Sequence, residues 1–182
     1  MPLPKPDPGG VGTDRPVLDQ SDFACILAHA LAERDRGLGT LPDRVGLAPA
    51  DLARLVARWF PGLDLPDLDL PFPEPPEAQK QLALLLTWRG GAASEDARWL
   101  ACILARRSME GNHLWEDLGL PSRTALGALI RRHFPRLHAA NTRNMRWKKF
   151  FYRQICADAG FSLCLAPSCG ECAEYRECFA PD

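Results

Sequence analysis

Ser94-Glu-Asp-Ala-Arg-Trp-Leu-Ala-Cys-Ile-Leu-Ala-Arg-Arg107 is the stretch that decides the fold class of this 182-residue chain. Ser94 is a typical N-cap, and Glu95 and Asp96 follow it in the first turn, where acidic side chains favour the helix dipole. The stretch therefore predicts a helix that ends near Arg107. No part of the sequence shows the sustained alternation of β-branched residues that is typical of strands. We therefore expect an all-α protein, a helical bundle with a C-terminal cysteine-rich metal-cluster loop.

Helical spacing of apolar residues, helix caps, and proline or glycine stops extend this prediction in both directions along the chain. We expect Pro135 to end one helix and Gly160 to end the last one. Besides 94–107, the predicted helices cover residues 22–36, 49–60, 77–89, 122–134 and 141–159, and residues 114–118 are expected to form a short turn or helix.

The chain divides into three parts by composition. Residues 1–20 contain five prolines, which predict a disordered or loosely attached arm. Residues 21–160 form the expected helical domain, and residues 161–182 form the expected cysteine-rich, cluster-binding segment. Within the domain, residues 61–76 contain six prolines and predict an extended connection. Its interspersed leucines predict packing across the helical core, and these are Leu63, Leu65, Leu68 and Leu70.

Composition also excludes several classes of protein. A hydrophobic content of 46% excludes a wholly disordered chain. The longest aliphatic run, Leu82–Leu86, is far shorter than the ~20 residues that span a bilayer. The N-terminal sequence has no apolar segment typical of a secretory signal. We expect a cytoplasmic protein with no membrane partner, in which thiols stay reduced.

The formal net charge of −1 hides a strong segregation of charge. From residue 123 to residue 153 the chain has nine basic residues and no Asp or Glu. Such a block is typical of a solvated helix face, a phosphate-binding surface, or a counterweight to a nearby anion. These basic residues are Arg123, Arg131, Arg132, Arg136, Arg143, Arg146, Lys148, Lys149 and Arg153.

Four of the seven cysteines lie close together near the C-terminus, in the pattern C-x4-C-x2-C-x5-C. Structural zinc sites commonly use two closely spaced pairs with a longer separation between them, and this pattern fits that arrangement poorly. Its first part is similar to the plant-type ferredoxin spacing. Spacing alone leaves an iron–sulfur cluster, a zinc site, and structural or redox thiols as alternatives. The four residues are Cys164, Cys169, Cys172 and Cys178.

Three stretches resemble the NifQ family of nitrogenase cofactor maturation proteins. One is Met145-Arg-Trp-Lys-Lys-Phe-Phe-Tyr-Arg-Gln-Ile-Cys156, followed by the cysteine pattern and Phe179. The others are His113-Leu-Trp-Glu-Asp-Leu-Gly-Leu120 and the segment from Arg98 to Arg107. The resemblance covers roughly residues 94–179.

The resemblance implies an iron–sulfur protein that acquires molybdenum on its cluster and donates it for synthesis of the nitrogenase iron–molybdenum cofactor. It implies a cluster of 3Fe–4S or 4Fe–4S type and a mixed molybdenum–iron–sulfur form. The implied metal ligands are Cys164, Cys169, Cys172 and Cys178. The implied partners are molybdate, the nitrogenase cofactor scaffold protein and the nitrogenase iron protein.

Other residues are candidates for supporting roles. We hypothesise that five basic residues offset the cluster charge and guide the oxyanion, and these are Arg143, Arg146, Lys148, Lys149 and Arg153. Cys156 and His113 are candidate extra metal ligands, although a core role for the cysteine and a capping or core role for the histidine are favoured. We interpret Cys25 and Cys102 as small core residues, and His133 and His138 as surface residues.

Two other functions compete with the molybdenum carrier. One is a zinc-stabilised helical protein that binds nucleic acid, and the other is a simple iron–sulfur electron carrier. The acidic pI of about 6.4 opposes nucleic-acid binding, and we expect none. The sequence has no nucleophile–base pair, phosphate loop or paired-carboxylate signature. We therefore expect a metal or cluster carrier rather than a catalyst.

Overall fold

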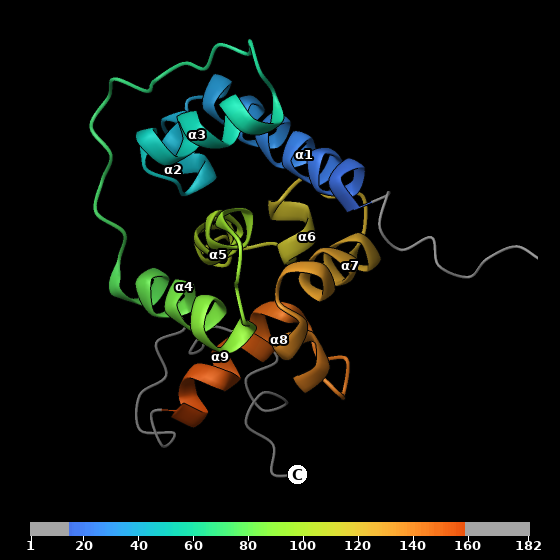
Figure 1. The fold of residues 1–182 in the computed structure, drawn as a ribbon. Coiled ribbons are helices and arrows are strands. Elements are labelled where there is room, and N and C mark those ends of the chain that lie inside the picture. Colours follow the sequence, from blue (N-terminus) through green and yellow to red (C-terminus); the bar gives the residue numbers. More distant parts are fainter. Residues whose placement is uncertain (1–14, 159–182) are drawn as a thin grey trace, which may run out of the picture.

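The structure is a computed structural model, and it describes residues 15–158. All regular elements in this range are helices, which confirms the all-α prediction (Figure 1). The helices are α1 (Arg15–Asp35), α2 (Leu41–Val45), α3 (Pro49–Trp59), α4 (Glu77–Gly90), α5 (Glu95–Arg107), α6 (Leu114–Asp117), α7 (Arg123–His133), α8 (Pro135–Ala140) and α9 (Trp147–Asp158). None of them combines the length and the apolar composition needed to cross a bilayer.

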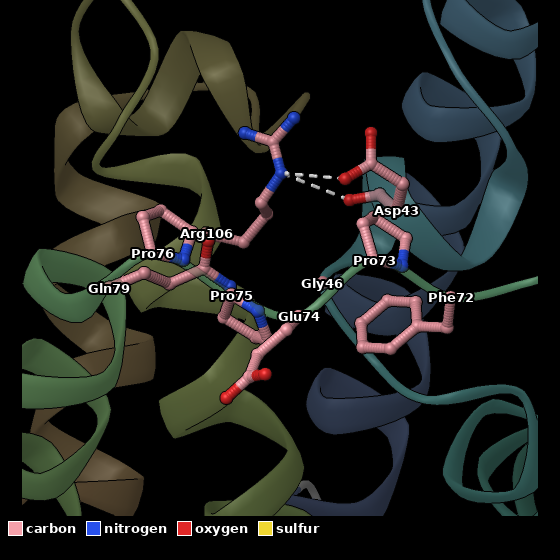
Figure 2. Close-up of a pocket in the computed structure, with 9 residues that line it drawn as sticks. All are labelled: Asp43, Gly46, Phe72, Pro73, Glu74, Pro75, Pro76, Gln79 and Arg106. Carbon is pink, nitrogen blue, oxygen red and sulfur yellow. Dashed lines mark hydrogen bonds and ion pairs between the residues drawn. The ribbon is translucent and has the colours of Figure 1, made fainter.

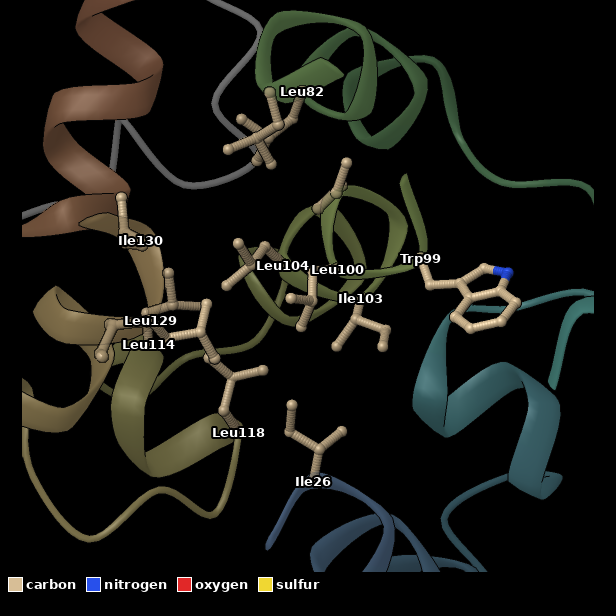
Figure 3. Packing of buried hydrophobic residues seen from close by; sticks show 14 of the residues in the cluster. Ile26, Leu82, Trp99, Leu100, Ile103, Leu104, Leu114, Leu118, Leu129 and Ile130 are labelled. Atoms are coloured by element: carbon tan, nitrogen blue, oxygen red, sulfur yellow. The ribbon is translucent and has the colours of Figure 1, made fainter. Parts of the chain in front are cut away.

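Helix α5 lies at the centre of the fold and contacts α2, α3, α4 and α6. It begins as predicted, because the Ser94 hydroxyl accepts a hydrogen bond of 3.1 Å from the Ala97 amide. Leu100, Ile103 and Leu104 of α5 are buried, among side chains from α1, α4, α6 and α7 (Figure 3). Full burial of each such side chain contributes roughly 1.5–3 kcal/mol to folding. The stretch that predicted the fold class is thus the centre of the core.

The N-terminal boundary of the helical part differs from the prediction. Helix α1 begins at Arg15, so residues 15–20 are helical and do not belong to an arm. These residues are held because Asp19 is buried and its carboxylate contacts two side chains of α7. The rest of the predicted arm lies outside the described residues.

Residues 61–76 form no helix or strand and run as a long trace from α3 to α4 (Figure 1). Leu65 and Leu68 pack against the core as predicted, whereas Leu63 and Leu70 are exposed. Asp67 anchors the connection. Its carboxylate accepts hydrogen bonds of 2.9 Å from Arg34 Nε and Nη2 and of 3.0 Å from the Leu41 amide.

Two short helices, α2 and α8, were not predicted, because five or six residues show no helical periodicity. Pro135 ends α7 but also occupies the first position of α8, where its missing N–H costs nothing. Helix α9 begins at Trp147, about five residues later than predicted. The Asn141 side chain closes a turn with the Met145 backbone, and Asn144 has a positive φ of 50°, so the helix cannot start earlier.

Candidate functional site

The four clustered cysteines, Cys164, Cys169, Cys172 and Cys178, lie outside the described residues. Among residues 15–158, no three His, Cys, Asp or Glu side chains come together as a group that could hold a metal ion. The ligand set itself stays a prediction.

Cys156, the first candidate extra ligand, is 1% exposed near the end of α9. It lies on the buried side of the helix with Phe151 and Ile155. This burial agrees with a core role. Cys25 and Cys102 are only partly buried, and both pack against the core.

His113, the second candidate, is exposed at the N-cap of α6. Its backbone N–H donates a hydrogen bond of 3.0 Å to the Glu116 carboxylate. In this contact the Glu116 side chain caps the helix and His113 contributes only its backbone, so a capping role of the imidazole stays a prediction. Metal ligation by His113 stays a prediction.

Lys148 of α9 is already engaged as the counter-ion of a buried carboxylate. Its Nζ donates hydrogen bonds of 2.6 Å to Asp117 Oδ2 and 2.7 Å to the Glu110 carbonyl. Asp117 is only 4% exposed and also accepts 3.0 Å from the Asn112 side chain. Lys148 therefore joins α9 to α6. The Asp117 carboxylate balances most of its charge, which reduces its attraction for an external anion.

The other four predicted basic residues differ in exposure, and two of them precede α9. Arg143 and Arg146 are exposed in the turn before the helix, and Lys149 and Arg153 are half-buried within it. At a rise of 1.5 Å per residue, Arg146 lies about 18 Å along the axis from Asp158, where the described chain ends. Most of these cations therefore gather where α9 begins.

A pocket of about 380 Å³ also lies at the beginning of α9, between it, α7 and α8. Arg123, Arg131 and His138 line it, and Trp147 and Asn144 complete the wall. We did not single out this pocket from the sequence. The available signal was the absence of acidic residues from the whole stretch that builds it, residues 118–157.

A second pocket, of about 260 Å³, lies where the Pro-rich connection passes α2 and α5 (Figure 2). Arg106 lines it, but Arg106 Nε donates 3.0 Å to the Asp43 carbonyl and its Nη1 donates 2.7 Å to Glu110. Because this guanidinium is satisfied by the fold and an acidic residue stands beside it, the pocket is a poor site for an anion.

His133 was interpreted as a surface residue, and this interpretation is wrong. The side chain is 4% exposed, and its Nε2 lies 2.9 Å from Asp19 Oδ1. Arg132 beside it donates 2.9 Å to the same oxygen and also pairs with Asp22. Burial alone would raise the pKa of Asp19, but His133 and Arg132 outweigh it and lower that pKa. Part of the basic block thus holds the fold together.

Comparisons with known proteins agree on one family. The family NifQ matches residues 22–180. The chain is 59% identical over 177 residues to Protein NifQ of Rhodobacter capsulatus, covering 97% of this chain and 98% of that protein. It is 37% identical over 179 residues to Protein NifQ of Azotobacter vinelandii, covering 90% and 91%. No solved structure is significantly similar to this chain.

Proposed function

The chain belongs to the NifQ family, and from this premise we propose that it is an iron–sulfur protein that loads molybdenum and donates it for synthesis of the nitrogenase iron–molybdenum cofactor. The observation that carries the proposal is the extent of the family match. It runs to residue 180 and so includes all four clustered cysteines. The family places the chain in nitrogenase cofactor maturation, and the metal chemistry is the proposed part.

The donor set fits an iron–sulfur cluster, because thiolates are the usual ligands of such clusters. Three of Cys164, Cys169, Cys172 and Cys178 suffice for a 3Fe–4S cluster, which supplies an open corner for a fourth metal. The remaining thiolate then serves as a ligand for the molybdenum cargo. Soft thiolate ligands suit iron–sulfur chemistry, so the same four residues are proposed to hold both metals.

The basic residues at the start of α9 are proposed to act before the thiolates do. Molybdate is an oxygen dianion, so Arg and Lys donors attract it more readily than thiolates. Arg143 and Arg146 are exposed and belong to a stretch without a carboxylate. Lys148 contributes less, because Asp117 already neutralises it.

The first test is anaerobic metal and sulfide analysis with electron paramagnetic resonance, on the full chain and on Cys→Ala variants of the four clustered cysteines. We expect a brown protein with iron and sulfide, and loss of iron in at least three of the four variants. Cys102→Ala is the matched control, because this half-buried thiol lies in the central helix. A colourless protein that holds zinc would overturn the proposal.

The second test separates oxyanion capture from cluster binding. Charge reversal at Arg143, Arg146, Lys149 and Arg153 should lower molybdenum loading while iron loading persists. Arg36→Glu, an exposed change at the end of α1, is the control. Molybdenum loading that is unchanged in the whole series would refute the proposed role of these residues. A simple electron carrier would be indifferent to molybdate in both tests.

A further inference from the structure

The pocket between α7, α8 and the start of α9 has several cationic or hydrogen-bond-donating side chains and no carboxylate in its wall. We propose that this pocket is a binding site for a tetrahedral oxyanion, with Arg123 and Arg131 as its two charged arms. None of its lining residues was among the predicted ligands.

The two arginines share one face of α7 and leave a gap between them. Arg123, Gly127 and Arg131 are spaced at i, i+4 and i+8, so they follow one another along the same side of the helix. A Cβ added at Gly127 would meet nothing within 4 Å, so the space between the two arms is open. Glycine weakens a helix interior relative to alanine. No neighbouring atom requires a glycine here, and its lack of a side chain leaves the space between the two arginines unfilled.

The three cationic or donor side chains of the pocket differ in the contacts that they already make. Arg123 Nη2 is held by the Asn144 carbonyl at 2.5 Å and by its side-chain oxygen at 3.2 Å, which leaves other N–H groups of the guanidinium available. Arg131 is exposed, and among residues 15–158 it has no ion-pair partner. His138 lies against Trp147, with ring centroids 6.0 Å apart, so the imidazole is held at the wall of the pocket.

The surroundings preserve the positive charge of the pocket. The neighbouring residue Arg132 points to the other side of α7, where Asp19 and Asp22 neutralise it. Among the described residues, no carboxylate lines the pocket beside Arg131. A volume of about 380 Å³ holds a small dianion with several of its water molecules, each of which needs ~30 Å³.

Arginine forks suit oxygen anions such as sulfate, phosphate and molybdate, which share tetrahedral shape and charge. The pocket itself rests on geometry alone. Only the assignment of molybdate as its natural occupant rests on the proposed function, in which the pocket would be an entry site for the cargo.

The test is isothermal titration of the full chain with molybdate, sulfate and phosphate, each alone. Arg131→Gln should weaken binding at least tenfold, and Gly127→Leu, which fills the open space, should abolish it. Gly127→Ala is the matched control and should bind within twofold of the parent chain. Circular dichroism melting of each variant establishes that the helices remain folded.

The same titration of a variant with all four clustered cysteines changed to alanine separates this site from the metal centre. Oxyanion binding should persist there, and loss of iron in that variant leaves the pocket proposal intact. The order of the three affinities identifies the natural anion, with tightest binding of molybdate assigning the cargo. Absence of binding for all three, or binding unchanged by Arg131→Gln and Gly127→Leu, would overturn the oxyanion site.

Discussion

Glu33 of α1 is the carboxylate that neutralises two buried arginines. It accepts hydrogen bonds of 2.8 and 3.1 Å from Arg44 and of 2.6 Å from Arg107, whose side chain is fully buried. Burial alone would raise the pKa of Glu33, but the hydrogen bonds and charges of Arg44 and Arg107 outweigh it and lower the pKa to about 2. Because this pKa is lowered from 4.5, the pairing stabilises the fold above pH 4.5, and that contribution is lost as the pH falls toward 2.

Glu33→Gln should therefore be strongly destabilising at neutral pH. The variant leaves Arg107 as a buried charge without a counter-ion, at a cost of about 3–5 kcal/mol in the free energy of unfolding. The difference from the parent chain should narrow as the pH falls from 4.5 toward about 2, because in this range the unfolded parent chain binds a proton at Glu33 that the folded chain does not. Urea unfolding at pH 7 and at several acidic pH values measures both effects.

Asp69→Asn, a change at an exposed carboxylate in the Pro-rich connection, is the control for charge removal. It should alter the unfolding free energy by less than about 0.5 kcal/mol at any pH. A Glu33→Gln variant as stable as this control at pH 7 would show that the two arginines find other partners.

The roles of some single residues could not be predicted from the sequence. The basic block predicted an anion-guiding role for Lys148, but its partner Asp117 is 31 positions away, and no local pattern reports such a pair. His133 was misplaced for the same reason, because its partner Asp19 lies 114 positions away. The cap at Ser94 was predicted correctly, because its hydrogen bond reaches only three residues along the chain.

Among the elements, the turn from Asn141 to Met145 sets where α9 begins. The Asn141 side chain donates 3.0 Å to the Met145 carbonyl and accepts 2.8 Å from the Met145 amide. The sequence predicted the helix and its end near residue 159, but not this delayed start. Asparagine is common both in turns and at helix N-caps, so the residue type alone does not distinguish the two roles. Only the backbone conformation around it does.

Asn141→Ala should lower the unfolding free energy by about 1–3 kcal/mol, because two backbone groups lose their partner. Thr142→Ala changes an exposed side chain in the same turn and should have little effect. Thermal melting followed by circular dichroism compares the two variants. Equal melting temperatures would mean that the Asn141 contacts do not hold the turn.

At the scale of the whole molecule, α1 and α7 are joined by charge. Asp19 accepts 2.9 Å from Arg132 and lies 2.9 Å from His133, so the first helix is tied to the basic stretch. Composition placed the boundary of the helical domain at residue 21, which would cut this contact. Proline content could not reveal this distant partner.

Two shortened chains test this boundary. A chain that begins at Arg15 keeps Asp19, whereas a chain that begins at Ser21 loses it and should be less stable by about 3 kcal/mol or more. Asp19→Asn in the longer of the two should reproduce most of the loss. Urea unfolding of all three at pH 7 gives the comparison. If the two shortened chains unfold at the same urea concentration, α1 is not held by its pairing with α7.

The acid-free stretch from 118 to 157 also has a consequence for the order in which the protein is made. Its partners Asp19 and Asp117 precede Arg132 and Lys148 by 113 and 31 positions. A ribosome adds about 5–20 residues each second from the N-terminus, so both carboxylates are synthesised before the cations that they neutralise. During synthesis from the N-terminus, Arg132 and Lys148 are therefore never made before the carboxylates that neutralise them.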